Sequence, residues 1–103
     1  MDRNEIHSTI MSTAGGVMTK EVGAVTGVLE LATRPQTRGI EVAVRYAGAD
    51  EWYTVEGSPL KPSKPGDPSE LRELHERVVE YLTTPGISVG VNEEPTSLRE
   101  FSP

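Results

Sequence analysis

Residues 52–82, WYTVEGSPLKPSKPGDPSELRELHERVVEYL, decide the fold, because an alternating strand, a proline-rich connection and a capped helix follow one another within them. The prolines of the connection are spaced by three residues, which is the repeat of a polyproline II helix; they are Pro59, Pro62, Pro65 and Pro68. This spacing predicts an extended strap over residues 58–66 rather than a loose loop. The strap therefore marks where a sheet ends and a helix begins.

The helix after the strap has the clearest start signals in the chain. Asp67 is a candidate N-cap, Pro68 fits the first helical position, and Glu70 completes a capping box. The apolar residues that follow recur with the period of a helix, so one stripe should pack against the sheet. The stripe consists of Leu71, Leu74, Val78 and Leu82. The sequence TTPG at residues 83–86 predicts the end of the helix.

Three strands are predicted before the strap. Residues 40–47 give the cleanest pattern, because Val42 and Val44 belong to an apolar set that alternates with polar or small residues. Residues 25–33 and 52–56 alternate less strictly, and short turns join the three segments. Short connections favour sequential pairing, so we expect an antiparallel meander over residues 25–56. The Val42 and Val44 face should meet the helix, which leaves the other face wet.

Two further elements are predicted at the ends of the chain. Residues 5–13 and 17–22 are both rich in β-branched residues and flank Gly15 and Gly16, which predicts an N-terminal hairpin. A short helix and a disordered arm are the alternatives for residues 1–23. Residues 87–91 alternate apolar and small side chains, which predicts a final strand at a sheet edge. The fold class is therefore α+β: a mostly antiparallel sheet with one amphipathic helix on one face.

Chain length favours one domain. With 103 residues, the chain has room for a single modest core, which we place in residues 1–91. Residues 92–103 are loop-like in composition, and we expect them to form a flexible C-terminal tail. Leu98 and Phe101 lie three residues apart in this tail and could present a small apolar face. Docking of that face on this domain or on a partner is the alternative to a free tail.

Composition excludes several classes of function. The net charge of −6 and a pI near 4.9 argue against direct nucleic-acid binding, which needs an excess of Lys and Arg. The absence of cysteine excludes disulfides and thiolate chemistry. The polar N-terminus and the lack of a long apolar run predict a cytoplasmic protein without a membrane segment. Arginine outnumbers lysine seven to three, a bias common in high-GC bacterial genomes.

The residues that could carry chemistry do not form a recognised motif. The chain has two histidines, His7 and His75, and its acids fall mostly on the expected solvent side of the helix or in the tail. It has no phosphate loop, nucleophile elbow or calcium-loop spacing. We therefore expect no cofactor and no metal site, and the pattern favours a protein that is not an enzyme.

The leading functional hypothesis is a small protein-interaction module, such as a regulator, an inhibitor or an accessory subunit. Its contact surface would be the wet face of the sheet around Trp52, Arg45 and Thr54, with Leu98 and Phe101 from the tail. Tryptophan and arginine are enriched among interface hot spots, which supports this surface. The alternative for Trp52 is that the N-terminal segment covers it.

The second hypothesis is a cofactor-free small-molecule binder or enzyme. Its pocket would lie between the sheet and the helix and would be lined by His75, Tyr46, Tyr53 and Tyr81. Burial of His75 against the sheet would shift its proton affinity, as in many functional sites. A homodimer formed through sheet edges is compatible with either hypothesis.

Overall fold

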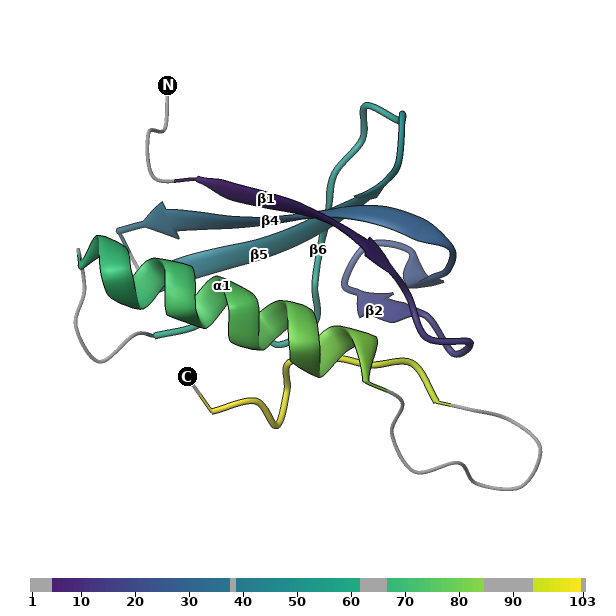
Figure 1. The fold of residues 1–103 in the computed structure, drawn as a ribbon. Helices are drawn as coiled ribbons and strands as arrows, with labels where there is room; N and C mark the ends of the chain where they lie inside the picture. Colours follow the sequence, from purple (N-terminus) through teal and green to yellow (C-terminus); the bar gives the residue numbers. More distant parts are fainter. Residues whose placement is uncertain (1–4, 38, 62–66, 85–93, 103) are drawn as a thin grey trace.

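The fold is an antiparallel sheet with one helix packed on one of its faces and a small hairpin beside it, as Figure 1 shows. The computed structural model describes residues 5–37, 39–61, 67–84 and 94–102. The predicted α+β class is confirmed. In chain order the elements are β1 (Ile6–Met11), β2 (Val17–Thr19), β3 (Gly23–Val25), β4 (Val28–Gln36), β5 (Gly39–Tyr46), β6 (Tyr53–Thr54) and α1 (Pro68–Thr83).

The predicted meander is confirmed: it supplies three consecutive strands of the four-stranded sheet, whose strand order is β1-β4-β5-β6. β4 pairs antiparallel with β5, which pairs antiparallel with β6. Val42 and Val44 of β5 are fully buried, because they lie on the face that meets the helix. Strict alternation in β5 therefore identified the buried face correctly.

The N-terminal pairing predicted from sequence is wrong. β1 does not form a hairpin with the segment after Gly16; it pairs antiparallel with β4, in a register that runs from Ile6 opposite Thr33 to Met11 opposite Val28. The hairpin is instead formed by β2 and β3. Pairing with β4 lets the alternate residues of β1 reach the core, where Ile10 is 5% exposed. A local hairpin would bury less of this face.

The helix follows its sequence signals. Asp67 caps it, because one side-chain oxygen accepts hydrogen bonds from the backbone N–H of Ser69 at 2.9 Å and of Glu70 at 3.4 Å. The predicted apolar stripe faces the sheet and is buried together with His75. The core that results joins side chains from the helix, both sheets and the C-terminal segment. Its members include Ile10, Val17, Leu29, Leu31, Val42, Val44, Val55, Leu71, Leu74, Val78, Leu82 and Leu98.

The C-terminal segment, expected as a flexible tail, lies against the domain. Leu98 is 2% exposed and belongs to the core, and its backbone N–H donates to the carbonyl oxygen of Glu56 at 2.8 Å. Thr96 donates its hydroxyl to the carbonyl of Leu82 at 3.0 Å, which satisfies a backbone acceptor in the last turn of α1. A Cβ atom at Gly57 would collide with the backbone of Leu98, so the two chain segments can approach this closely only at a glycine.

Two sequence predictions fall on residues that the structure does not describe. The strap is described only at its ends, because residues 62–66 lie outside the described ranges. At its start, Leu60 is buried and forms an isolated bridge with Ile40 of β5. The final strand expected at residues 87–91 also lies outside the described residues.

Docking of the C-terminal segment predicts a measurable contribution to stability. Leu98→Ala should lower the free energy of unfolding by about 2–4 kcal/mol, because it removes buried methyl groups and leaves a cavity. Chemical denaturation followed by circular dichroism measures this change. Met11→Ala is the matched control, since Met11 is 63% exposed and its truncation should cost less than about 0.5 kcal/mol. Equal, small effects of both substitutions would contradict the docked arrangement.

Candidate functional site

The face of the sheet opposite α1 carries a row of residues that crosses all four strands. Strand register aligns His7 of β1, Ala32 of β4, Ala43 of β5 and Thr54 of β6 in this row. We call this surface the open face, because α1 packs on the other side of the sheet. The two alanines at its centre are only 0% and 2% exposed, so another group covers them.

Trp52 is the group that the geometry places above the alanines. Its ring centroid lies 4.5 Å from the guanidinium carbon of Arg34, 4.6 Å from that of Arg45 and 5.6 Å from the imidazole centroid of His7, which meets it edge-on. These three residues surround the alanine pair in the strand register. We name the group formed by Trp52, Arg34, Arg45 and His7 the tryptophan cage. Its contacts are cation–π and T-shaped aromatic contacts.

Carboxylates hold both arginines of the cage in place. Arg45 donates two hydrogen bonds to Glu30, directly across the strand pair, at 3.0 and 3.2 Å. Arg34 donates to Glu41 at 3.4 Å. Its buried Nε lies 3.2 Å from a carboxylate oxygen of Glu5, an ion pair that lacks the alignment of a hydrogen bond. The carboxylates therefore fix the positions of the two guanidinium groups that contact the indole, and they neutralise the charges of both arginines.

The same contacts change the proton affinities of two acids. The hydrogen bonds from Arg45 hold the pKa of Glu30 below its ordinary value. Burial alone would raise the pKa of Glu5, but its hydrogen bond with His7 and the charge of Arg34 outweigh burial and lower it. Both carboxylates are therefore ionised at neutral pH. Neither of them has the raised pKa of a general acid.

Thr54, a predicted contact residue, is held by a neighbouring loop. Glu21, which follows β2, accepts hydrogen bonds at 2.7 Å from both the backbone N–H and the hydroxyl of Thr54. Lys20 beside it donates its backbone N–H to the carbonyl of Thr54. The loop thereby fixes the short strand β6 and places Thr54 at the rim of the open face.

The open face also has an apolar end that sequence analysis did not identify. Met11 and Val28 are directly paired in the β1–β4 register and are 63% and 44% exposed. They lie on the open face next to the Thr9–Glu30 pair: Met11 comes two residues after Thr9 in β1, and Val28 comes two residues before Glu30 in the antiparallel β4. Sequence analysis missed this pair because it paired residues 5–13 with residues 17–22, whereas in the structure β1 pairs with β4 and Met11 lies opposite Val28.

The two tail residues predicted as contacts lie away from the open face. Leu98 is buried in the core. Phe101 packs edge-on against Tyr81 of α1 at 5.1 Å between ring centroids, and Arg77 lies over its ring at 5.2 Å. Of the five predicted contact residues, the structure therefore brings together Trp52, Arg45 and Thr54 only.

The four residues predicted to line a pocket have separate surroundings. His75 is 3% exposed, and its ring nitrogens lie 2.7 Å from the Ser8 hydroxyl and 2.9 Å from the Thr33 hydroxyl. A neutral imidazole can donate to one hydroxyl and accept from the other, so this buried polar group is fully satisfied. Of the tyrosines, Tyr53 donates to Glu51, Tyr81 packs on Phe101, and Tyr46 is 43% exposed.

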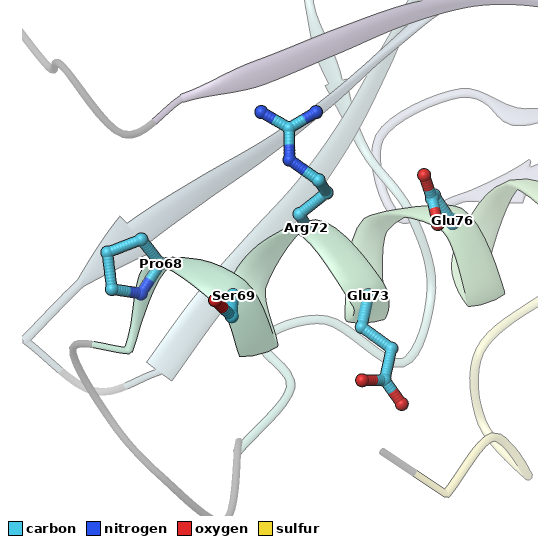
Figure 2. Close-up of a pocket in the computed structure, with 5 residues that line it drawn as sticks. All are labelled: Pro68, Ser69, Arg72, Glu73 and Glu76. Atoms are coloured by element: carbon cyan, nitrogen blue, oxygen red, sulfur yellow. The ribbon is translucent and has the colours of Figure 1, made fainter.

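A shallow hollow is present on the solvent side of α1, as Figure 2 shows. It has a volume of about 400 Å³ and is lined by residues of the helix alone, namely Pro68, Ser69, Arg72, Glu73 and Glu76. It shares no residue with the tryptophan cage or with the predicted pocket. Its lining is mostly charged, unlike the largely apolar lining of small-molecule sites.

Within the described ranges, we find no group of three or more histidine, aspartate or glutamate side chains placed to hold a metal ion. The one described helix is too short and too polar to cross a bilayer. No protein family model, curated protein or solved structure matches this chain. The candidate site is therefore defined by its own geometry, with the tryptophan cage and the Met11–Val28 pair as its parts.

The contacts in the cage predict that Trp52 stabilises the fold, although its side chain is partly exposed to solvent. Trp52→Ala should lower the free energy of unfolding by about 1–3 kcal/mol, because it uncovers the two alanines and removes both cation–π contacts. Trp52→Phe keeps an aromatic ring and should lose less. Urea denaturation of the three proteins measures the order. Unchanged stability in Trp52→Ala would show that the ring does not cover the sheet.

Burial of His75 predicts a dependence of stability on pH. Burial lowers the pKa of His75 below that of a free imidazole, so the unfolded chain takes up a proton more readily than the folded one. The contribution of neutral, buried His75 to the free energy of unfolding is fully present above about pH 6.5. It is lost as pH falls below that value, by at most about 1.4 kcal/mol per pH unit. The carboxylates with lowered pKa titrate below about pH 4.5, outside this window.

Denaturation between pH 7.5 and 5.5 tests this dependence. His75→Gln should remove most of the slope, whatever its effect on absolute stability. His7→Gln is the matched control, because His7 is the other histidine of the chain and is exposed. The same slope in both variants would contradict the assignment to His75.

Proposed function

We propose that this protein is a small, non-enzymatic interaction module that binds another protein through the open face of its sheet. The observation that carries the proposal is the exposed Met11–Val28 pair next to the tryptophan cage, on a sheet face that the helix does not cover. Exposed apolar side chains that adjoin an ordered aromatic residue are typical of protein contact surfaces.

The chemistry of the face favours a protein as the partner. Trp, Arg and Met are the residue types enriched in the cores of protein interfaces. Because Arg34 and Arg45 are already paired with carboxylates, the face offers little free positive charge to a phosphate backbone. Its rigid ion pairs also lower the entropic cost of binding, since the side chains are ordered beforehand. A regulator, an inhibitor or an accessory subunit would have these properties.

The structure changes which residues we propose as contacts. Trp52 and Arg45 remain at the centre, with Thr54 at the rim, and Met11 and Val28 take the place that Leu98 and Phe101 had in the sequence analysis. The absence of cysteine is compatible with a cytoplasmic location, which we retain as part of the proposal.

No specific observation favours the alternative, a small-molecule binder or enzyme with a pocket beside His75. Both ring nitrogens of His75 are engaged by hydroxyl groups, and the ring is almost fully buried. A general base needs a proton-bearing substrate within hydrogen-bond reach. Hydrogen bonding of this kind is typical of a satisfied core histidine.

Site-specific photo-crosslinking in a lysate of the source cells tests the proposed surface. A photoreactive phenylalanine analogue at Val28 should give a discrete crosslinked protein, because this position belongs to the exposed apolar pair of the proposed contact. The matched control carries the analogue at Tyr81, which is similarly exposed but belongs to the helix. Adding an excess of the unlabelled protein should remove the Val28 product, and an excess of Trp52→Ala should not. Identical products from both positions, or none from Val28, would contradict the proposal.

A further inference from the structure

The two edges of the four-stranded sheet differ in how they are covered. β6 forms one edge, and the hairpin side of the molecule covers it: Lys20 donates to the carbonyl of Thr54 and Glu56 donates to the carbonyl of Met18, both at 2.9 Å. β1 forms the other edge, and among the described strands it pairs with β4 alone. The strand order β1-β4-β5-β6 places β1 at the edge opposite to β6. Within the part of the chain that the structure describes, the open edge is therefore that of β1.

Two hydrogen bonds fix which backbone groups of β1 point outward. Ser12 donates its N–H to the carbonyl of Gly27, and Val28 accepts from Ala47 on the β5 side. Since backbone bonds alternate along an antiparallel pair, Ile10, Ser8 and Ile6 continue the bonding toward β4. The N–H and C=O groups of the intervening residues point to the open edge; these residues are His7, Thr9 and Met11.

The sequence of β1 lacks the residues that normally protect an edge strand, and α1 contacts β1 from the core face. Natural sheets discourage edge pairing with lysine, proline, inward charges, bulges or very short strands. β1 has six residues, IHSTIM, and none of them is proline, lysine, arginine, aspartate or glutamate. By contrast, β6 has only two residues. Among the described residues, the molecule thus protects one edge and leaves on the other a regular strand without lysine, arginine or acidic side chains.

We propose that a second copy of this chain docks on β1, so that two β1 strands pair antiparallel across a two-fold axis at Thr9. In this arrangement Thr9 faces Thr9, and His7 faces Met11 of the other copy. Each of these residue pairs exchanges two backbone hydrogen bonds. The interface is isologous, since each contact occurs twice.

Three observations favour a second copy as the occupant of this edge. The pairing places no like charges opposite one another, although each chain carries a net charge of −6. The pairing also gives the exposed thioether of Met11 an aromatic neighbour, because Met11 of one copy lies beside His7 of the other copy's tryptophan cage. It also joins the two sheets into one, which extends the open face without covering Trp52.

The contact area sets the expected strength of the dimer. A pair of six-residue strands buries less than the roughly 1,200 Å² of a standard stable interface, so the dimer should be reversible and depend on concentration. This inference goes beyond the proposed function, because it concerns the sheet edge rather than the face. Failure of the dimer proposal would not decide the proposed function, and the reverse also holds. The dimer needs no further protein, and the Val28 crosslink needs no dimer.

Sedimentation equilibrium of the purified protein from about 10 µM to 1 mM tests the proposal with three variants. Thr9→Lys should weaken dimerisation by about fivefold or more, because two lysines would face each other on the axis. It should still fold, since Thr9 is exposed and lies across from Glu30 in the monomer. Thr9→Val keeps a β-branched, uncharged strand and should dimerise like the unmodified protein. Val22→Lys adds the same charge at an exposed position off the edge and should also dimerise.

Amide hydrogen exchange at low and high protein concentration locates the contact. Exchange at His7, Thr9 and Met11 should slow as the dimer forms, whereas Ile6, Ser8 and Ile10 are protected by β4 at every concentration. A protein that stays monomeric at 1 mM would overturn the proposal. A dimer that Thr9→Lys does not weaken, or that leaves exchange at Thr9 unchanged, would overturn it as well.

Discussion

Pairing of β1 with β4 is the constraint on which the other parts of the structure depend. It turns Ser8 and Ile10 toward the helix, where the Ser8 hydroxyl meets the buried His75. The same pairing turns His7 to the opposite face, where it meets Trp52. Because side chains alternate along a strand, a shift of the register by one residue would exchange these two sets. It would bury the His7 imidazole, which now belongs to the tryptophan cage, and would turn the Ser8 hydroxyl away from His75.

The open face is built from small residues at its centre and charged residues around them. Ala32 and Ala43 are directly paired, and their short side chains leave room for an indole to lie close to the sheet. Pairs of opposite charge stand on either side, Arg34 with Glu41 and Arg45 with Glu30. Individually, such partly exposed ion pairs contribute little to stability. Their effect here is to orient two guanidinium groups against one ring.

Sequence reasoning succeeded where the signals are local. The cap at Asp67, the apolar stripe of α1 and the alternation of β5 each depend on residues a few positions apart. Sequence reasoning also expected Arg45 and Trp52 on one face, because their strands are neighbours in the chain. It failed where the partner is distant: β1 pairs with residues more than 15 positions away, and Leu98 enters a core formed by residues 10–82. A six-residue strand with both helical and extended patterns does not specify which strand it joins.

The charge arrangement links the fold to the kind of activity that it favours. Catalytic sites usually contain an acid or base whose pKa is moved toward neutrality, or a cation left free to bind substrate. On the open face the carboxylates Glu5 and Glu30 have lowered pKa values, and the arginines beside them are neutralised. Within the face the arginines are thus paired with carboxylates, and its apolar parts are the ones that the proposed contact would use. A surface of this kind recognises shape and apolar area, whereas a surface with unpaired charges would attract small ions and nucleic acid.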